Sequence, residues 1–338
     1  MKFSVIIPVY NGEKHLKGAV DSLQRGTYTD WEAIVVDDGS TDETLKLAQT
    51  LAEKDGRIKP VHKENGGVSA ARNMGMKFAN GEWIIWLDSD DAYVENALET
   101  IAKIINANDG INCIQFPYNI INASGKIQPI ITKAYREFGG GVYSGKEAFD
   151  ILFAREGYGG LNWQPWRFAF RHDKLPTFRT GVIHEDVDVL PAFTYGLDKV
   201  YIAKEALYAY RPANEGAATA AFNAKRVKDI IDVTEHVYAS IAKLHMDREV
   251  ERRFKSTLAC NLFGFYLASP GFPEPGRSES LELFAKHRDM LIAIDDPPKT
   301  AWVKRFMIRV LGVKGAAKLI WRLAAKRTAH ALDWKDAK

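Results

Sequence analysis

The sequence predicts an α/β fold, with a mainly parallel sheet and flanking helices over residues 1–221 and an α-helical region over residues 222–338. Short apolar runs alternate with helical patterns through the first hundred residues, and Gly, Asn and Asp separate them. This alternation is typical of βαβ units with right-handed crossovers. After residue 222 only helical patterns continue. We expect residues 1–110 and 111–221 to form the two halves of the sheet domain.

The composition indicates a globular protein with a full core, since 46% of the 338 residues are hydrophobic and 26% are charged. A formal net charge of +3 gives no reason to expect a nucleic-acid partner. No secretory leader and no run of about 18 apolar residues is visible. The two cysteines, Cys113 and Cys260, match no metal-binding spacing. We therefore expect a cytoplasmic protein with buried thiols.

Individual elements follow from local patterns. Runs rich in β-branched residues predict strands, and a 3.6-residue apolar period predicts helices. Ser40 to Glu43 has the spacing of a capping box, so a helix should begin there. The predicted strands are residues 4–9, 33–36, 58–62, 83–87 and 111–118, with a hairpin turn at 122–125, and the predicted helices are residues 13–24, 40–52, 68–78 and 144–153.

Three carboxylates follow the apolar run at residues 83–87, namely Asp88, Asp90 and Asp91. Carboxylates crowded at the end of a strand repel one another, so a positive partner is expected there. A divalent cation that takes oxygen ligands, together with substrate phosphates, would satisfy this need. The alternative is a solvated turn in which Asp91 caps a helix that starts near Val94.

Polar residues end three predicted strands, at Tyr10–Asn11, Asp37–Asp38 and Asp88–Asp90. In a parallel sheet these strand ends lie on one rim, where ligands bind. The first strand lacks the Gly-x-Gly-x-x-Gly of a dinucleotide site. Residues 140–146 fit most of a phosphate loop, but Glu147 replaces the hydroxyl that would hold magnesium, which argues against that reading.

Four motifs follow one another along the first hundred residues, namely SVIIPVYN at residues 4–11, IVVDDGSTD at 34–42, NGGVSAARNMG at 65–75 and LDSDD at 87–91. Together they resemble a family 2 glycosyltransferase. The resemblance implies a GT-A type, Rossmann-like fold and an inverting transfer from a nucleotide-diphosphate sugar. It also implies that Asp88-Ser89-Asp90 is an Asp-x-Asp site for ribose and metal, with Mn²⁺ or Mg²⁺ as cofactor. The residues that it assigns to the nucleotide pocket are Pro8, Tyr10, Glu13, Asp38 and Arg72.

The residue chemistry agrees with these assignments. The Asp38 carboxylate can accept the imino N–H of uracil, and the spacing of Asp88 and Asp90 points both to one side of an extended segment. One can hold the ribose hydroxyls and the other, Asp90, the metal. Arg72 could instead be a surface helix residue, and Asp42 is better explained as a charge at a helix N-terminus than as a ligand.

The second half of the chain also resembles the family. Glu185 and Asp186 should open a helix on the acceptor side, and a Tyr-x-Tyr-Arg strand follows at residues 208–211. An inverting transfer needs one base, for which we choose Asp186, because repulsion from Glu185 would raise a carboxyl pKa toward neutrality. The alternative is that both simply favour a first helical turn. Arg211 is expected to contact the diphosphate, although Gly216 is followed by alanines instead of the family's Gly-Ser pair.

Trp163 and Trp166 follow a glycine-rich stretch, and they are either sugar platforms or ordinary core. The competing classes of function are a nucleotide-sugar binding module without catalysis and a nucleotidyltransferase. Glu185–Asp186 argues against the first, and the lack of a triphosphate loop argues against the second. The expected partners are a UDP-sugar donor and a glycan or lipid-linked glycan acceptor of surface polysaccharide synthesis.

The tail from residue 299 to 338 holds eleven Lys and Arg and two Asp. Its apolar residues have helical spacing, with basic residues beside them and Trp302, Trp321 and Trp334 along it. This pattern suits the anionic inner face of a membrane. The alternative is a helix whose stripe packs on the protein. The stripe residues are Val303, Phe306, Met307, Val310 and Leu311, followed by Ala316, Leu319, Ile320 and Leu323.

Overall fold

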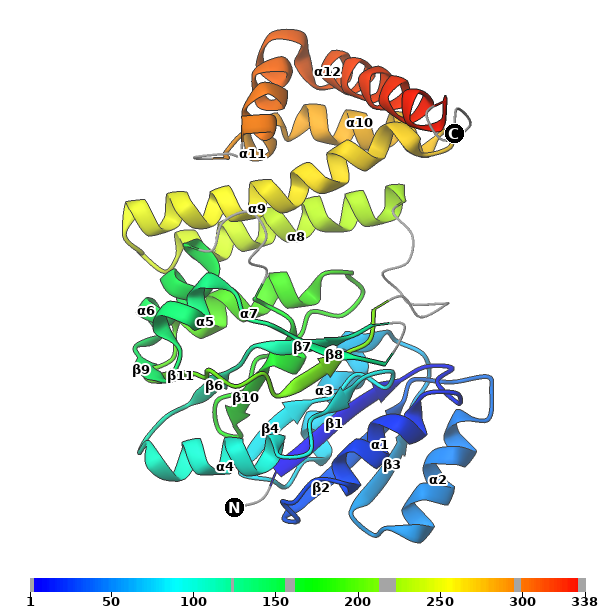
Figure 1. Cartoon of the computed structure of the whole chain (residues 1–338), viewed down its shortest axis with the longest axis vertical. Coiled ribbons are helices and arrows are strands. Elements are labelled where there is room, and N and C mark those ends of the chain that lie inside the picture. Colours follow the sequence, from blue (N-terminus) through cyan, green and yellow to red (C-terminus); the bar gives the residue numbers. More distant parts are fainter. Residues whose placement is uncertain (1–2, 123–124, 156–161, 213–222, 295–298, 334–338) are drawn as a thin grey trace. The chain divides into compact units, whose positions relative to one another are not determined.

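The computed structural model describes residues 3–122, 125–155, 162–212, 223–294 and 299–333, with the side chains of 299–302, 304 and 323–333 excepted (Figure 1). It divides into two compact units, one of residues 1–156 with 160–217 and one of residues 157–159 with 218–338. Of the described residues, those in the first unit form both sheets, and the regular elements in the second unit are helices.

The large sheet of the first unit has the strand order β3-β2-β1-β4-β10-β6-β11-β9. The first four strands along the chain pair in parallel, which confirms the predicted βαβ arrangement. β10 runs antiparallel to both of its neighbours, β4 and β6, and no pattern in the sequence predicted it. The strands are β1 (Phe3–Val9), β2 (Trp31–Asp37), β3 (Ile58–His62), β4 (Trp83–Trp86), β6 (Cys113–Gln115), β9 (Gly141–Tyr143), β10 (Phe168–Arg171) and β11 (Val200–Ile202).

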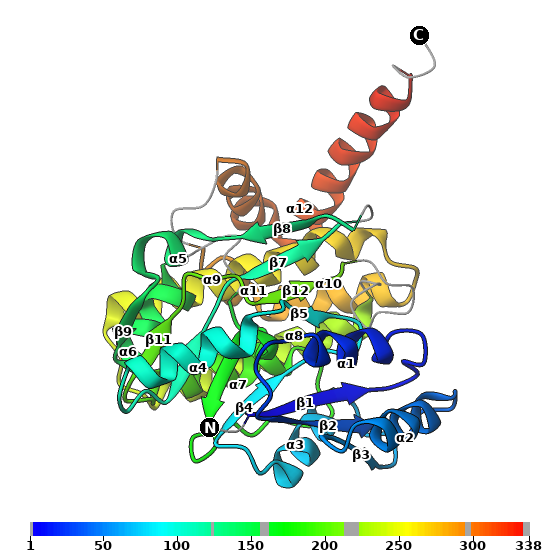
Figure 2. The same cartoon turned by 60° about the horizontal axis from the view of Figure 1, so that its bottom comes forward.

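A second sheet has the order β5-β12-β7-β8, and its four strands lie side by side in Figure 2. The single strand predicted at residues 111–118 is wrong, because the chain leaves the large sheet after Gln115 and enters this one at Tyr118. Pro117, which has no N–H to give to a ladder, lies at the crossing. The predicted hairpin is present as β7 and β8. The bounds are β5 (Ala92–Tyr93), β7 (Tyr118–Ile121), β8 (Ile127–Ile130) and β12 (Tyr208–Tyr210).

The helices predicted in the first unit are present, but two of them begin later than expected. The helix expected from residue 13 begins at Leu16. The helix expected after Ser40 begins at Thr44 instead, because the Ser40 hydroxyl accepts the Asn11 backbone N–H and the Asp42 carboxylate accepts that of Thr44. The helices are α1 (Leu16–Gln24), α2 (Thr44–Lys54), α3 (Val68–Phe78), α4 (Ala97–Ala107), α5 (Lys133–Phe138), α6 (Gly145–Phe149) with a π-helical turn at Asp150–Ala154, a 3₁₀ turn at Pro165–Arg167, and α7 (Glu185–Tyr195).

The segment that resembled a phosphate loop begins α6. Ser144 caps this helix, and the Glu147 carboxylate accepts the Ser144 backbone N–H, so that the pair forms a capping box. Glu147 therefore has a structural reason to be there. Its side chain satisfies the helix start and does not take the place of a magnesium ligand.

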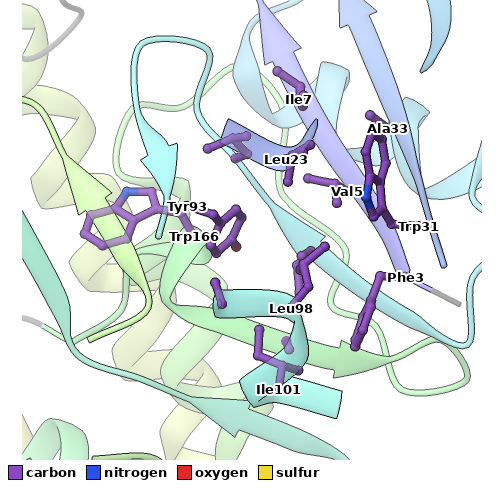
Figure 3. Close-up of a cluster of buried hydrophobic side chains, with 14 of the residues drawn as sticks. Phe3, Val5, Ile7, Leu23, Trp31, Ala33, Tyr93, Leu98, Ile101 and Trp166 are labelled. Carbon is purple, nitrogen blue, oxygen red and sulfur yellow. The ribbon is translucent and has the colours of Figure 1, made fainter. Parts of the chain in front are cut away.

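Alternate residues of β1 point to the two faces of the sheet. Phe3, Val5 and Ile7 join α1 and α4 in a buried cluster, part of which Figure 3 shows. Ile6 points to the other face, where α3 packs so closely that a Cβ on Gly75 would lie 2.4 Å from the Ile6 Cγ2. This close packing holds α3, and with it Arg72, against the strands that carry the site.

The second unit has its own buried core. Helices α8 (Ala224–Ala242) and α9 (Arg248–Ala268) contribute most of it, with α10 (Gly276–Lys286), α11 (Arg288–Leu291) and the first part of α12 (Lys299–Asp333). At Gly312 the backbone of α12 is not helical, with φ of 70°, so a break divides the helix there. The residues of α12 that enter this core are Ile308, Val313, Ala316 and Ala317.

Most residues in the first half of the predicted apolar stripe are exposed, so the alternative in which this stripe packs on the protein is wrong for them. Of its residues, Met307 is half-buried, whereas Val303, Phe306, Val310 and Leu311 are exposed. Ile308, which lay outside the stripe, points inward instead, because the core contacts of this segment select a different face. Trp321 is 51% exposed. The side chain of Trp302 and all of Trp334 lie outside the described residues.

Within the described ranges, none of the helices combines the length and the apolar character needed to cross a membrane.

Candidate active site

The end of β4 carries the predicted metal motif. The buried strand passes directly into a turn in which the Asp91 N–H donates to the Asp88 carbonyl at 3.1 Å. Asp88, Ser89 and Asp90 are partly exposed, whereas Asp91 is buried. Burial raises the pKa of Asp88, and the nearby Asp90 and Glu185 carboxylates raise it further, while Arg72 opposes them. The crowding of negative charge expected from the sequence is present.

Arg72 of α3 supplies the positive partner. Its guanidinium is buried, and it donates through one NH2 group to Asp88 at 3.3 Å and through the other to Glu185. The family resemblance assigned Arg72 to the nucleotide pocket, and the alternative was a surface helix residue. The alternative is wrong, because the Arg72 side chain is buried. Arg72 thus joins the metal motif to Glu185, which lies 113 positions after Arg72 in the chain.

Glu185 and Asp186 begin α7, as expected. His184, the residue before them, has a left-handed backbone with φ of 74°. Such a conformation costs a non-glycine residue about 1–3 kcal/mol and is frequent at functional sites. Burial, and then the charge of Glu185, raise the pKa of Asp186 to about 7. This carboxyl is therefore able to exchange a proton near neutral pH.

Asp91 does not cap a helix, which makes the alternative reading of this turn wrong. Helix α4 begins at Ala97, after Asn96, and the Asp91 carboxylate bonds elsewhere. It accepts the Tyr208 hydroxyl at 2.8 Å and the Arg211 backbone N–H at 2.7 Å. Burial, followed by the charges of Asp88 and Asp90, raises the pKa of Asp91 to about 8. The side chain of Arg211 is exposed, and residues 216–218, where the family's Gly-Ser pair was missed, lie outside the described residues.

Asp38, predicted to bind uracil, organises the loop between β3 and α3. Its carboxylate accepts Lys63 Nζ at 2.5 Å and the backbone N–H groups of Gly66 and Gly67 at 3.0 and 2.8 Å. A carboxylate has about four acceptor sites, so these three hydrogen bonds do not use its full capacity. Gly39 permits this arrangement, since its φ is +73° and a Cβ there would lie 2.7 Å from the Asn65 nitrogen.

The other residues assigned to the nucleotide pocket lie along the first loop. Tyr10 is 52% exposed, and Pro8 is buried within β1. The Glu13 carboxylate accepts the Glu43 backbone N–H at 3.1 Å, which ties the loop to the start of α2. A Cβ on Gly12 would lie 3.5 Å from the Ser89 hydroxyl, so this loop adjoins the metal motif.

Trp163 and Trp166 are both buried, so the core reading of these tryptophans is the right one. The Trp166 ring stacks on Tyr208 with centroids 4.4 Å apart and on Tyr210 with centroids 5.7 Å apart. Trp166, one of the two candidates for a sugar platform, thus packs against strand β12 instead. Tyr208 and Asp91 were the site residues that it missed.

The sequence of the first unit matches a known family. Residues 4–179 fit the model of glycosyl transferase family 2. The chain belongs to this family. It is a glycosyltransferase, and its mixed α/β architecture is the GT-A fold that the motifs implied. The match ends before Glu185 and Asp186, so the roles of these two residues stay predictions.

Relatives of this glycosyl transferase family 2 member cover most of the chain. Glycosyltransferase GlyG of Streptococcus pneumoniae serotype 4 is 28% identical over 271 residues, which make up 75% of this chain and 86% of GlyG. The structure of S. aureus TarS 1–349 in complex with UDP-GlcNAc superposes with a TM-score of 0.63 at 18% identity, covering 96% of this chain and 92% of TarS 1–349. GalNAc-T7 with UDP, GalNAc and Mn²⁺ has a TM-score of 0.51 at 18% identity, covering 85% and 54%.

The carboxylates at the end of β4 could supply some of the ligands of a divalent metal ion. In the ranges that the structure describes, no three His, Cys, Asp or Glu side chains form a complete set of ligands. Asp88 and Asp90 provide carboxylate oxygens two residues apart on a partly exposed turn. Mg²⁺ is commonly held by one or two carboxylates together with substrate phosphates and water, so two protein ligands are sufficient.

Proposed function

We propose that this glycosyltransferase moves a sugar from a UDP-sugar to a hydroxyl of a glycan or lipid-linked glycan, with inversion at the anomeric carbon. The observation that supports the proposal most is the ion bridge of Arg72, which holds the Asp88–Asp90 turn and the Glu185–Asp186 pair together. If the diphosphate of the donor binds at the Asp88–Asp90 turn, the anomeric carbon of its sugar would lie near the Glu185–Asp186 pair. This is the arrangement that a single in-line displacement needs.

In the proposed reaction the acceptor oxygen forms a bond to the anomeric carbon while the bond from that carbon to the diphosphate oxygen breaks. Asp186 accepts the proton of the acceptor hydroxyl, and UDP leaves with the bonding electrons. Asp90 and Asp88 would hold Mn²⁺ or Mg²⁺, which when bound neutralises charge on the diphosphate leaving group. Glu185 pairs with Arg72, and its charge, after burial, raises the pKa of Asp186.

The choice of UDP rests on two supports. TarS was solved with UDP-GlcNAc and with UDP, and it shares the fold of this chain. The Asp38 carboxylate retains an acceptor site for the imino N–H of uracil, while Pro8, Tyr10 and Glu13 lie along the adjoining loop. We propose that Ser89 and the Asp88 carboxylate contact the ribose, and that Arg211 contacts the diphosphate.

A membrane surface is the proposed location of the acceptor. The exposed apolar residues Val310 and Leu311 of α12 lie beside the exposed Arg309 and Lys314, and Trp321 lies beside Arg322. Helices of this kind bind anionic headgroups, with about 1 kcal/mol for each basic residue near the surface. We infer a cytoplasmic enzyme that is peripheral on the inner face of the membrane, where a lipid-linked glycan would be within reach.

Thermal unfolding with nucleotides tests the donor and metal assignments together. A ligand that binds only the folded state at 100 times its Kd stabilises it by about 2.7 kcal/mol. We expect UDP with Mn²⁺ to raise the Tm more than UTP, ATP or NAD. Asp90→Ala should lose the part of the shift that EDTA removes, and Asp88→Ala should weaken UDP binding with and without metal.

Two results would count against the proposal. Equal shifts with all the nucleotides would overturn the UDP assignment. An Asp90→Ala variant that still responds to EDTA like the wild type would overturn the metal assignment. Release of UDP from a panel of UDP-sugars in the presence of the protein then identifies the sugar.

A further inference from the structure

The turn that carries Asp88 and Asp90 is fastened at both ends by one hydroxyl group. The Asp88 backbone N–H donates to the Tyr208 Oη at 3.1 Å, and the Tyr208 hydroxyl donates to the Asp91 Oδ2 at 2.8 Å. Asp88 and Asp91 are the first and last residues of the turn. The Tyr208 oxygen therefore fixes the distance between its ends, which sets how the carboxylates in between are presented.

The ring that carries this hydroxyl is itself held in place. Tyr208 is fully buried, and it stacks on Trp166 with an interplanar angle of 14°. On another side it meets the Tyr93 ring edge-on, with centroids 5.3 Å apart. Its backbone pairs with Tyr93 in the small sheet. Close packing on these sides restricts the movement of the ring and so holds its hydroxyl in place.

The Asp91 carboxylate extends the connection to a second functional segment. Its Oδ1 accepts the Arg211 backbone N–H at 2.7 Å, immediately after β12. Asp91 is 2% exposed, so its carboxyl group meets these two protein donors, the Tyr208 hydroxyl and the Arg211 N–H, instead of solvent. The buried Asp91 side chain thus connects the turn to the backbone that follows β12.

We propose that Tyr208 and Asp91 are positioning residues for the metal and diphosphate site, which hold the Asp88–Asp90 turn and the backbone of Arg211 in one arrangement. This inference rests on the proposed function, since it assumes that the turn binds a divalent cation with UDP. Partners that orient metal ligands typically change metal affinity by 10–100-fold when they are removed. The loss of one hydroxyl at Tyr208 should therefore be visible in metal binding.

The test compares two tyrosines of one strand. Tyr208→Phe removes the bridging hydroxyl and keeps the ring that stacks on Trp166. Tyr210→Phe is the matched control, because its ring also stacks on Trp166 while the described residues give its hydroxyl no hydrogen bond. The first measurement is the Kd of Mn²⁺ in the presence of UDP, which is obtained from the electron paramagnetic resonance signal of free Mn²⁺. The second is the Kd of UDP in EDTA, which is obtained by calorimetry.

We expect Tyr208→Phe to weaken Mn²⁺ binding about 10-fold and UDP binding in EDTA by less than about 2-fold. Tyr210→Phe should stay within about 2-fold of the wild type in both. In Asp91→Asn an NH2 group replaces one carboxylate oxygen, so it faces either the Tyr208 hydroxyl or the Arg211 backbone N–H, which are both donors. This variant should act like Tyr208→Phe, and it replaces Tyr208→Phe in the test if Tyr208→Phe folds poorly.

Three results would contradict these expectations, and they can be told apart. If Tyr208→Phe and Asp91→Asn lower the Tm but bind Mn²⁺ with wild-type affinity, these residues only stabilise the fold and the inference is wrong. The same holds if Tyr210→Phe weakens Mn²⁺ binding as much as Tyr208→Phe. A wild-type protein that binds no Mn²⁺ with UDP would overturn the proposed function itself, together with the roles of Tyr208 and Asp91.

Discussion

Asp186 is the side chain on which transfer depends most directly in the proposed reaction. Asp186→Asn keeps the size of the residue but cannot take up the proton of the acceptor. We expect the variant to bind UDP normally and to lose about two to four orders of magnitude in kcat, the usual contribution of a general base. Calorimetry measures the first effect and release of UDP the second. Near-normal turnover would move the role to Glu185 or to Asp188, which is paired with Arg179 at 2.9 Å.

The pH dependence of the same residue follows from its environment. Burial and Glu185 raise the pKa of Asp186 to about 7, and the base must be deprotonated to act. The value of kcat/KM should therefore rise as the pH increases through about 7 and then level off. In Asp186→Asn the residual activity should lack this rise. A wild-type profile that is flat between pH 6 and 8 would contradict the assignment.

Among the secondary-structure elements, the first three strands of the chain share one buried carboxylate. Glu32 of β2 accepts Ser4 of β1 at 2.6 Å, Lys59 of β3 at 2.6 Å and the Asn80 backbone N–H at 2.7 Å. Burial acts to raise the pKa of Glu32, but these hydrogen bonds outweigh it and lower the pKa to about 2. The carboxylate therefore stabilises the half of the sheet from which the donor site is built.

We expect Glu32→Gln to lower the free energy of unfolding at pH 7 by about 1.5–3 kcal/mol, since hydrogen bonds to a charged group are lost. The pKa is lower in the folded state, so this stabilisation is present above pH 4.5 and disappears as the pH falls toward 2. Urea unfolding of the variant and the wild type at pH 7 and pH 3 measures the difference.

Glu43→Gln is the control for this variant. Its carboxylate pairs with Lys46 on the surface, where both side chains are more than half exposed. Exposed pairs of this kind contribute about 0–1 kcal/mol. A Glu32→Gln variant as stable as Glu43→Gln would show that the hydrogen bonds of Glu32 do not hold the strands together.

For the molecule as a whole, the open question is what the basic tail binds. The replacement of Val310 and Leu311 by Ser removes exposed apolar area from α12 and leaves Ile308 and the rest of the core in place. We expect the wild type to sediment with liposomes that contain anionic lipid and not with neutral ones. The double variant should lose most of this binding at an unchanged Tm, and salt should weaken it in the wild type.

Phe78→Ser is the control, because Phe78 is 49% exposed on α3, a helix that is not part of the tail. It should sediment like the wild type. If the double variant binds liposomes as well as the wild type, or if neutral liposomes bind equally, the membrane proposal fails. A cut after Pro298 is not a suitable test, since it would remove Ile308, Val313 and Ala316 from the core of the second unit.

The local elements of this chain could be predicted because their patterns are local. The run Trp83 to Leu87 reads as a buried strand whatever surrounds it, and α3 covers the residues expected. β10 was missed because four residues carry too little periodicity, and its partners β4 and β6 are distant in sequence. The predicted start of α2 was wrong because the Ser40 hydroxyl, which would have capped the helix, accepts the backbone N–H of Asn11 instead. These two residues are about 30 positions apart in the chain.

The sequence by itself determined the family, the order of the βαβ units and the need for a positive charge near Asp88 and Asp90, since each follows from neighbouring residues or from motifs. Only the tertiary structure decided that Arg72 is a source of this charge and that Asp91 binds Tyr208 instead of a helix end. It also turned Ile308 to the core and left Val310 exposed. These pairings depend on packing between segments up to 120 residues apart, for which spacing along the chain carries no signal.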